Sequence, residues 1–127
     1  MTESLLYIAS PYSHPDPAVR EQRLDAAYLA VATLLSAGHV VFSPIVHSHP
    51  LTRFGLPLEW EFWERVDRRF LETCDEVVVL MLPGWEASRG VLAEIAIAWE
   101  LGKPVRYVEP DATTTPTLAR NATAASV

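Results

Sequence analysis

Four short aliphatic runs alternate along the chain with longer segments in which apolar residues recur at helical spacing. The runs occupy residues 5–9, 40–42, 76–82 and 105–108. Strands that are apolar throughout are typical of parallel sheets buried on both faces, and their alternation with helices predicts a helical layer on each side. We therefore expect an α/β fold of three layers with a parallel sheet in the strand order 2-1-3-4.

Local signals predict where the first two helices lie. Asp16 is a favoured N-cap residue and Pro17 suits the first helical position, so the first helix is expected to begin there and to end at Gly38. The second helix is expected over residues 58–74. Residues 44–57 contain several prolines, two histidines and a glycine, which predict a long irregular loop of the kind that often carries function.

Ser88 is expected to cap a third helix, which ends at Gly102. In parallel sheets of this kind, ligands bind beyond the carboxyl ends of the strands, where the strand order reverses. The first and third strands flank that point in the expected order. The loops at residues 10–15 and 83–88 are therefore expected to form the walls of a binding crevice.

The composition narrows the class of partner. The 127 residues carry a net charge of −6, which disfavours binding to a nucleic-acid polymer or to an anionic membrane. Cys74 is the only cysteine, so an internal disulfide framework is excluded, and with only four histidines a metal site is not expected. No apolar run has the length of a membrane span or of a signal-peptide core. We expect a cytoplasmic protein whose ligand is a small molecule.

Glu94 is the only polar side chain among residues 91–99. Its neighbours at helical spacing are also apolar, so it does not belong to a solvated stripe. A carboxylate near a helix N-terminus is favoured by the helix dipole, but that effect does not account for the apolar surroundings. We therefore favour a functional role, because unpaired acids are rarely placed among apolar groups without one.

Asp67, on the second predicted helix, is also an acid with apolar neighbours. It shares a predicted helix face with Trp63 and Leu71, whereas Glu64 and Arg68 belong to a solvated charged face. One interpretation is a buried structural acceptor. The other is a partner for Glu94, because two carboxylates with different surroundings are what a displacement at a sugar carbon needs.

Polar residues at the expected crevice walls are weaker signals. Ser88, Arg89 and Gly90 open the third helix, whose free backbone N–H groups suit an anion, although a plain serine cap explains the serine equally well. Ser10 and Tyr12 follow the first strand, and their hydroxyls suit a ribose or a phosphate. The alternative is a turn built from turn-forming residues.

Two histidines and two tryptophans near the expected crevice are interpreted mainly as packing residues. His47 and His49 lie in the expected loop without metal-ligand partners at useful spacing, which indicates loop residues or packing on a base. Trp60 and Trp63 suit stacking on a base, while core packing is expected for at least one of them.

These motifs resemble the nucleoside 2-deoxyribosyltransferase superfamily, and the resemblance covers residues 5–108. It rests on four segments: Tyr-Ile-Ala-Ser-Pro-Tyr at 7–12, Asp67 eight residues before Asp75, Ser-Arg-Gly-Val-Leu-Ala-Glu at 88–94, and Leu-Gly-Lys-Pro at 101–104. The resemblance implies a flavodoxin-like (Rossmann-like) fold. It also implies a nucleoside 2-deoxyribosyltransferase-like domain at residues 1–110, followed by a Thr/Ala-rich C-terminal tail at residues 111–127.

The resemblance further implies cleavage of an N-glycosidic bond, with Glu94 as the nucleophile and Asp67 as its helper. Transferases of the superfamily usually carry an aspartate where Ser88 stands. The branch that hydrolyses 2′-deoxynucleoside 5′-monophosphates carries a serine there, which holds the phosphate. The first loop of this chain lacks the glycine-rich, arginine-bearing pattern of those hydrolases and looks like that of an uncharacterised side branch.

The reaction expected from this resemblance begins with attack of Glu94 on the anomeric carbon and expulsion of the base. Water or a second base then completes hydrolysis or transfer. Ser88, Arg89 and nearby N–H groups would hold a phosphate, with Gly90 allowing close approach, and the sugar would be lined by Tyr7, Ser10 and Tyr12. No metal or organic cofactor is implied, and a homo-oligomer is expected. The alternative function is a non-catalytic nucleotide-binding or interaction module.

Overall fold

The computed structural model describes residues 3–110. The tail predicted at residues 111–127 therefore lies outside the described residues. Four parallel strands form a single sheet in the order β2-β1-β3-β4. They are β1 (Leu5–Ala9), β2 (Val40–Phe42), β3 (Glu76–Leu80) and β4 (Val105–Val108). The predicted strand order and the α/β class are confirmed.

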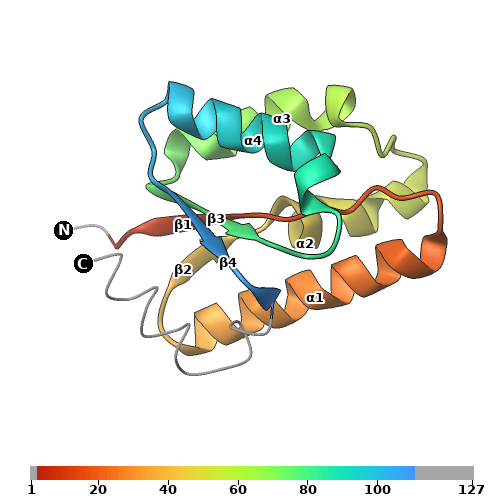
Figure 1. Cartoon of the computed structure of the whole chain (residues 1–127), viewed down its shortest axis with the longest axis horizontal. Helices are drawn as coiled ribbons and strands as arrows, with labels where there is room; N and C mark the ends of the chain where they lie inside the picture. Colours follow the sequence, from red (N-terminus) through yellow and green to blue (C-terminus); the bar gives the residue numbers. More distant parts are fainter. Residues whose placement is uncertain (1–2, 111–127) are drawn as a thin grey trace.

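Helices cover both faces of the sheet, so the chain forms three layers (Figure 1). Helix α1 (Pro17–Ser36) lies on one face. Helices α3 (Trp60–Thr73) and α4 (Arg89–Glu100) lie side by side on the other. The cap predicted for α1 is present, because the Asp16 carboxylate accepts a hydrogen bond from the backbone N–H of Ala18 at 2.9 Å.

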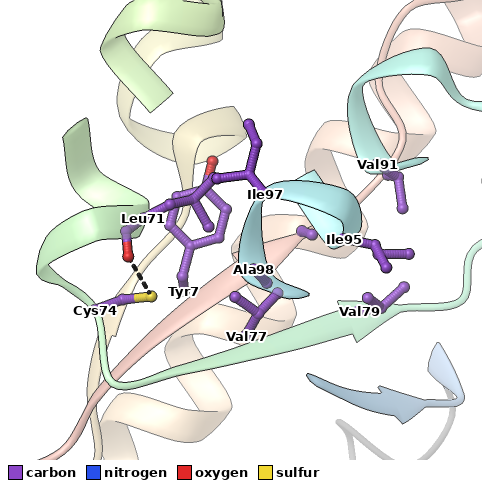
Figure 2. Close-up of a cluster of buried hydrophobic side chains, with 10 residues drawn as sticks. Tyr7, Leu71, Cys74, Val77, Val79, Val91, Ile95, Ile97 and Ala98 are labelled. Carbon is purple, nitrogen blue, oxygen red and sulfur yellow. Dashed lines mark hydrogen bonds between the residues drawn. The ribbon is translucent and has the colours of Figure 1, made fainter. Parts of the chain in front are cut away.

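The central strands β1 and β3 send alternate side chains into two separate cores. Tyr7 and Val77 point towards α3 and α4, and Figure 2 shows them among the apolar side chains of that layer. Leu6 and Ile8 point the other way and pack with the α1 side chains. The aliphatic runs are therefore explained by burial on both faces, and Tyr7 is directed to the α3–α4 side.

The segment predicted as an irregular loop at residues 44–57 is instead mostly helical. It contains the short helix α2 (Pro44–Ser48) and the 3₁₀ helix η1 (His49–Phe54). The Ser43 hydroxyl caps α2 by accepting from the Val46 N–H at 3.2 Å. The prediction was wrong because proline is tolerated in the first turn of a helix, where its missing N–H has no intrahelical partner anyway.

The approach to α4 also contains a short helical turn, η2 (Trp85–Ala87). Gly84 precedes it with φ of 88°, a left-handed conformation that favours glycine. Ser88 then caps α4, as predicted, because its hydroxyl accepts from the Val91 N–H at 3.3 Å.

Within the described residues, no helix combines the length and apolar character needed to cross a membrane.

Candidate active site

A pocket of about 480 Å³ opens beyond the carboxyl end of β1, next to the N-terminus of α4. Its volume lies in the range of pockets that hold small molecules. The pocket is lined by residues from the β1–α1 loop, α2 and η1, the segment leading into α3, α3 itself, and the start of α4. They are Ser10, Tyr12, Ser13, His14, Pro15, Ile45, His49, Leu58, Glu59, Trp60, Glu61, Trp63, Asp67, Ala87, Ser88, Arg89, Gly90 and Glu94.

Glu94 lies in the second turn of α4 and is only 4% exposed. The hydroxyl of Tyr7 donates a hydrogen bond to its Oε2 atom. Burial raises the pKa of Glu94 well above its ordinary value, and the nearby charge of Asp67 raises it further. The hydrogen bond from Tyr7 acts in the opposite direction, because it stabilises the ionised carboxylate.

Asp67 lines the same pocket and is 6% exposed. It lies on the apolar face of α3, which also buries Trp63 and Leu71. Among residues 3–110, no group forms a hydrogen bond with its Oδ1 atom. Burial raises the pKa of Asp67 to about 7. A carboxyl group with this pKa is suited to both donating and accepting a proton near neutral pH.

The position of Tyr7 differs from the expected one, in which the residue lines the sugar. It is fully buried and is not among the residues that line the pocket. Burial and the charge of Glu94 raise the pKa of its hydroxyl well above 10, so the group remains a hydrogen-bond donor. The residue contacts Glu94 instead of the pocket space, because β1 directs it towards the α3–α4 layer.

The three residues at the start of α4 all line the pocket. The Ser88 hydroxyl is used for the helix cap. Arg89 is exposed and forms an ion pair with Glu61 of α3. A Cβ atom added to Gly90 would meet Trp60 at 3.7 Å, an ordinary van der Waals contact.

The β1–α1 loop contributes two of the predicted substrate-binding residues. Ser10 is 5% exposed, and within the described part of the chain its hydroxyl has no hydrogen-bond partner. Tyr12 is half-buried, and its ring packs against that of His49, with 3.9 Å between the ring centroids. Both residues line the pocket with Asp67 and Glu94.

His49, for which the sequence indicated a loop residue or packing on a base, lines the pocket. It is 9% exposed, and burial lowers the pKa of its ring to about 4. No periodicity marks such a residue, since it lies at the junction of α2 and η1. His47 is exposed and is not among the lining residues.

Arg23 of α1 is a second residue that sequence reasoning missed. Its guanidinium donates hydrogen bonds to the carbonyl of Ser13 at 2.9 Å and to the carbonyl of Pro83 at 3.0 Å. These carbonyls belong to the two loops that were expected to form the crevice walls. The arginine therefore holds the β1–α1 loop and the loop after β3 together.

The arrangement brings two buried carboxyl groups of different surroundings to one pocket. One carries a tyrosine donor and the other has an unpartnered oxygen, so their protonation equilibria differ and are coupled by charge. Such a pair can supply one nucleophile and one proton carrier. Within residues 3–110, no group of three or more His, Cys, Asp or Glu side chains is placed to hold a metal ion.

Comparison with solved structures found a protein whose structure is similar to that of this chain. The protein is described as a 2-deoxyribosyltransferase from the psychrotolerant bacterium Bacillus psychrosaccharolyticus. It matches with a TM-score of 0.62 and 28% sequence identity, over 84% of this chain and 73% of that one. The likeness supports the resemblance to the nucleoside 2-deoxyribosyltransferase superfamily.

Comparison with curated proteins found no match. A family model described as "Domain of unknown function (DUF1937)" matches residues 4–109. This match spans the whole sheet and all the helices that line the pocket. The chain therefore belongs to the DUF1937 family.

Proposed function

We propose that the protein is an enzyme that cleaves the N-glycosidic bond of a (deoxy)nucleoside or its 5′-monophosphate. Glu94 is the nucleophile and Asp67 carries the proton. The observation that carries the proposal is the meeting of these two buried carboxyl groups in one pocket of suitable size. A non-catalytic binding module has no need of such a pair, because isolated acids are costly to bury. The likeness to a deoxyribosyltransferase supports the same reaction class.

One proton, carried by Asp67, serves both halves of the proposed reaction. The Glu94 carboxylate, held by the Tyr7 hydroxyl, attacks the anomeric carbon while the C–N bond to the base breaks. The base leaves with the bonding electrons and takes the proton of Asp67, whose pKa of about 7 suits this donation. A glycosyl ester of Glu94 and an Asp67 carboxylate result.

The second half of the reaction releases the sugar. In hydrolysis, a water molecule attacks the anomeric carbon, the bond to Glu94 breaks, and Asp67 takes the proton of the water. In transfer, a second base attacks in place of water and loses its proton to Asp67. Both outcomes return the two carboxyl groups to their starting protonation states.

The pocket offers contacts for the rest of the substrate. Ser10 and Tyr12 are proposed to contact the sugar, because both line the pocket and Ser10 carries an unpartnered hydroxyl. The start of α4, with Ser88, Arg89 and Gly90, is proposed to take the 5′ end. A 5′-phosphate there must compete with Glu61 for Arg89, so both the nucleoside and the monophosphate remain substrates to test.

The test is release of base from the common deoxynucleosides, ribonucleosides and their 5′-monophosphates, followed by chromatography. Wild-type protein and Glu64→Gln should release base, and Glu94→Gln should release none while retaining its fold. Glu64 is a suitable control because it is an exposed glutamate of α3 outside the pocket lining. A slow 2-fluoro sugar substrate should leave its glycosyl mass on the peptide that contains Glu94. Release by Glu94→Gln, or a label on another peptide, would disprove the nucleophile assignment.

A non-catalytic nucleotide-binding module is the function to consider if no substrate releases base. Under that outcome, the wild-type protein would still bind nucleotides, and Glu94→Gln would bind them at least as well, because a buried acid is removed. Measured binding without turnover would therefore separate the two functions.

A further inference from the structure

His49 and the start of α4 both line the pocket and follow different strands of the sheet. His49 follows β2 in the chain, whereas Ser88 follows β3, and these two strands lie on opposite sides of β1. Two hydrogen bonds fix the backbone of His49. The His49 N–H donates to the Ile45 carbonyl, and the Thr52 hydroxyl donates to the His49 carbonyl at 2.6 Å.

One face of the His49 ring is already covered. The Tyr12 ring lies against it, with 3.9 Å between centroids and 34° between planes. Trp63 packs at a larger centroid distance of 5.9 Å and is itself fixed, because its indole N–H donates to the Pro57 carbonyl at 2.8 Å. These two contacts fix the position of the His49 ring in the pocket wall.

The edge of the ring carries an unsatisfied polar atom. His49 is nine-tenths buried, and no group in residues 3–110 forms a hydrogen bond with its Nδ1 atom. Buried polar atoms in proteins nearly always have a hydrogen-bond partner. Because His49 lines the pocket, a ligand bound there is the candidate partner for this atom. Ser10 and Asp67 show the same property in the same pocket.

We propose that His49 is the residue that recognises the base, through a hydrogen bond between its ring edge and a polar atom of the purine or pyrimidine. The inference rests on the proposed function, which assigns Glu94 to the anomeric carbon and the start of α4 to the 5′ end. The base then lies on the remaining side, where Tyr12, His49 and Trp63 form aromatic walls. Aromatic walls suit the flat faces of bases, and a polar edge among them distinguishes one base from another.

Two other roles for His49 fit the observations less well. A general acid must carry a proton at working pH, but burial lowers the pKa of this ring to about 4, so it is neutral. A metal ligand needs partners, and none of the described residues form a group able to hold a metal with it. A neutral imidazole offers one donor and one acceptor, which matches the mixed edges of bases.

The test compares His49→Phe, which keeps an aromatic ring against Tyr12 but removes both nitrogens, with the wild type. The control is His47→Phe, the same change at an exposed position outside the pocket lining. kcat/KM for base release is measured for the adenine, guanine, cytosine and thymine deoxynucleosides. Binding of the corresponding free bases is measured by calorimetry. His49→Asn serves as the conservative variant, because the amide of asparagine places a polar group near the position of Nδ1.

His49→Phe should reduce the ratio between the best and worst base by about tenfold or more, the effect of one lost hydrogen bond in a buried site. His47→Phe should leave the ratio unchanged, and His49→Asn should recover part of it. In the wild-type protein, the preferred free base should also shift the ring ¹⁵N resonances of His49, a readout that does not depend on any variant.

Each other result has a definite meaning. Base release by the wild type with an unchanged base preference in folded His49→Phe would overturn the role of His49 and leave the proposed function standing. Free-base binding that His49→Phe weakens, without any base release by the wild type, would support His49 and overturn the proposed reaction. Failure of the wild type to bind or release any base would overturn both. If His49→Phe does not fold, the ring ¹⁵N shifts of the wild type decide the question.

Discussion

The Tyr7 hydroxyl of β1 donates a hydrogen bond to Oε2 of Glu94 in α4. The donor lies on the central strand β1, whose side chains from Leu6 to Ala9 are buried, so its position is set by the sheet and not by the pocket. The bond also opposes the rise in the pKa of Glu94 that burial causes. A residue outside the pocket lining thus contributes to the orientation and the ionisation of the proposed nucleophile.

Tyr7→Phe is expected to slow base release by roughly tenfold to a hundredfold, the usual effect of removing a hydrogen bond to a charged group. Without the donor, the pKa of Glu94 rises further, so the acidic limb of the kcat–pH profile should move to higher pH. Tyr28→Phe, at an exposed position of α1, is the matched control. An unchanged pH profile in Tyr7→Phe would show that the bond does not tune Glu94.

Asp67 makes the stability of the protein depend on pH. Its pKa is raised from 3.8 to about 7, so the folded state binds a proton that the unfolded chain has released. The resulting stabilisation is complete below about pH 4, decreases as the pH rises towards 7, and is absent above that. Asp67→Asn should make this slope shallower, because Glu94 keeps its own raised pKa, and should raise the free energy of unfolding at pH 8 by ~1–3 kcal/mol.

Urea unfolding of wild type and Asp67→Asn between pH 4 and pH 8 measures the effect. Asp25→Asn, an exposed aspartate of α1, should behave like the wild type. The same slope in Asp67→Asn and in the wild type would mean that Asp67 does not contribute to it.

Ser88→Ala tests whether the Ser88 hydroxyl contacts a substrate phosphate or only caps α4. If a 5′-monophosphate is a substrate, its binding should weaken by about 1–3 kcal/mol, whereas a nucleoside should be barely affected. Ser43→Ala is a close control, because Ser43 caps α2 in the same way but does not line the pocket. Equal losses for nucleoside and monophosphate, measured by calorimetry, would show that Ser88 serves the helix and not the ligand.

The expected homo-oligomer remains a prediction, and α4 offers a place to test it. Leu92 and Trp99 are exposed by 47% and 66%, and their spacing of seven residues places them on one helix face. Exposed apolar faces of this kind often contact other proteins. Trp99→Glu should lower the mass measured by light scattering, and an unchanged mass would exclude this face as the contact.

The elements predicted correctly are those whose causes are local. The strands follow from short aliphatic runs, and the starts of α1 and α4 follow from Asp16 and Ser88, whose side chains accept hydrogen bonds from nearby N–H groups. The burial of Asp67 was foreseeable because the apolar face of α3 is long enough to show a clear period. These signals act within a few residues, so they can be read from the chain alone.

The features missed depend on contacts between distant segments. Whether α2 and η1 form is decided partly by packing, since helices of five and six residues are too short to be stable alone. The hydrogen bond between Tyr7 and Glu94 and the place of His49 beside Tyr12 join parts of the chain with no shared periodicity. Only the fold reveals them.

Arg23 ties the lengths of the two pocket walls to each other. Because one guanidinium holds both loop carbonyls, an insertion in either loop would pull on the other. Gly84 tightens the constraint, since a Cβ atom there would come within 2.7 Å of Arg23 Nη2. We therefore expect relatives with altered pocket walls to differ in side chains within loops of constant length, and changes of loop length to co-occur with loss of the arginine.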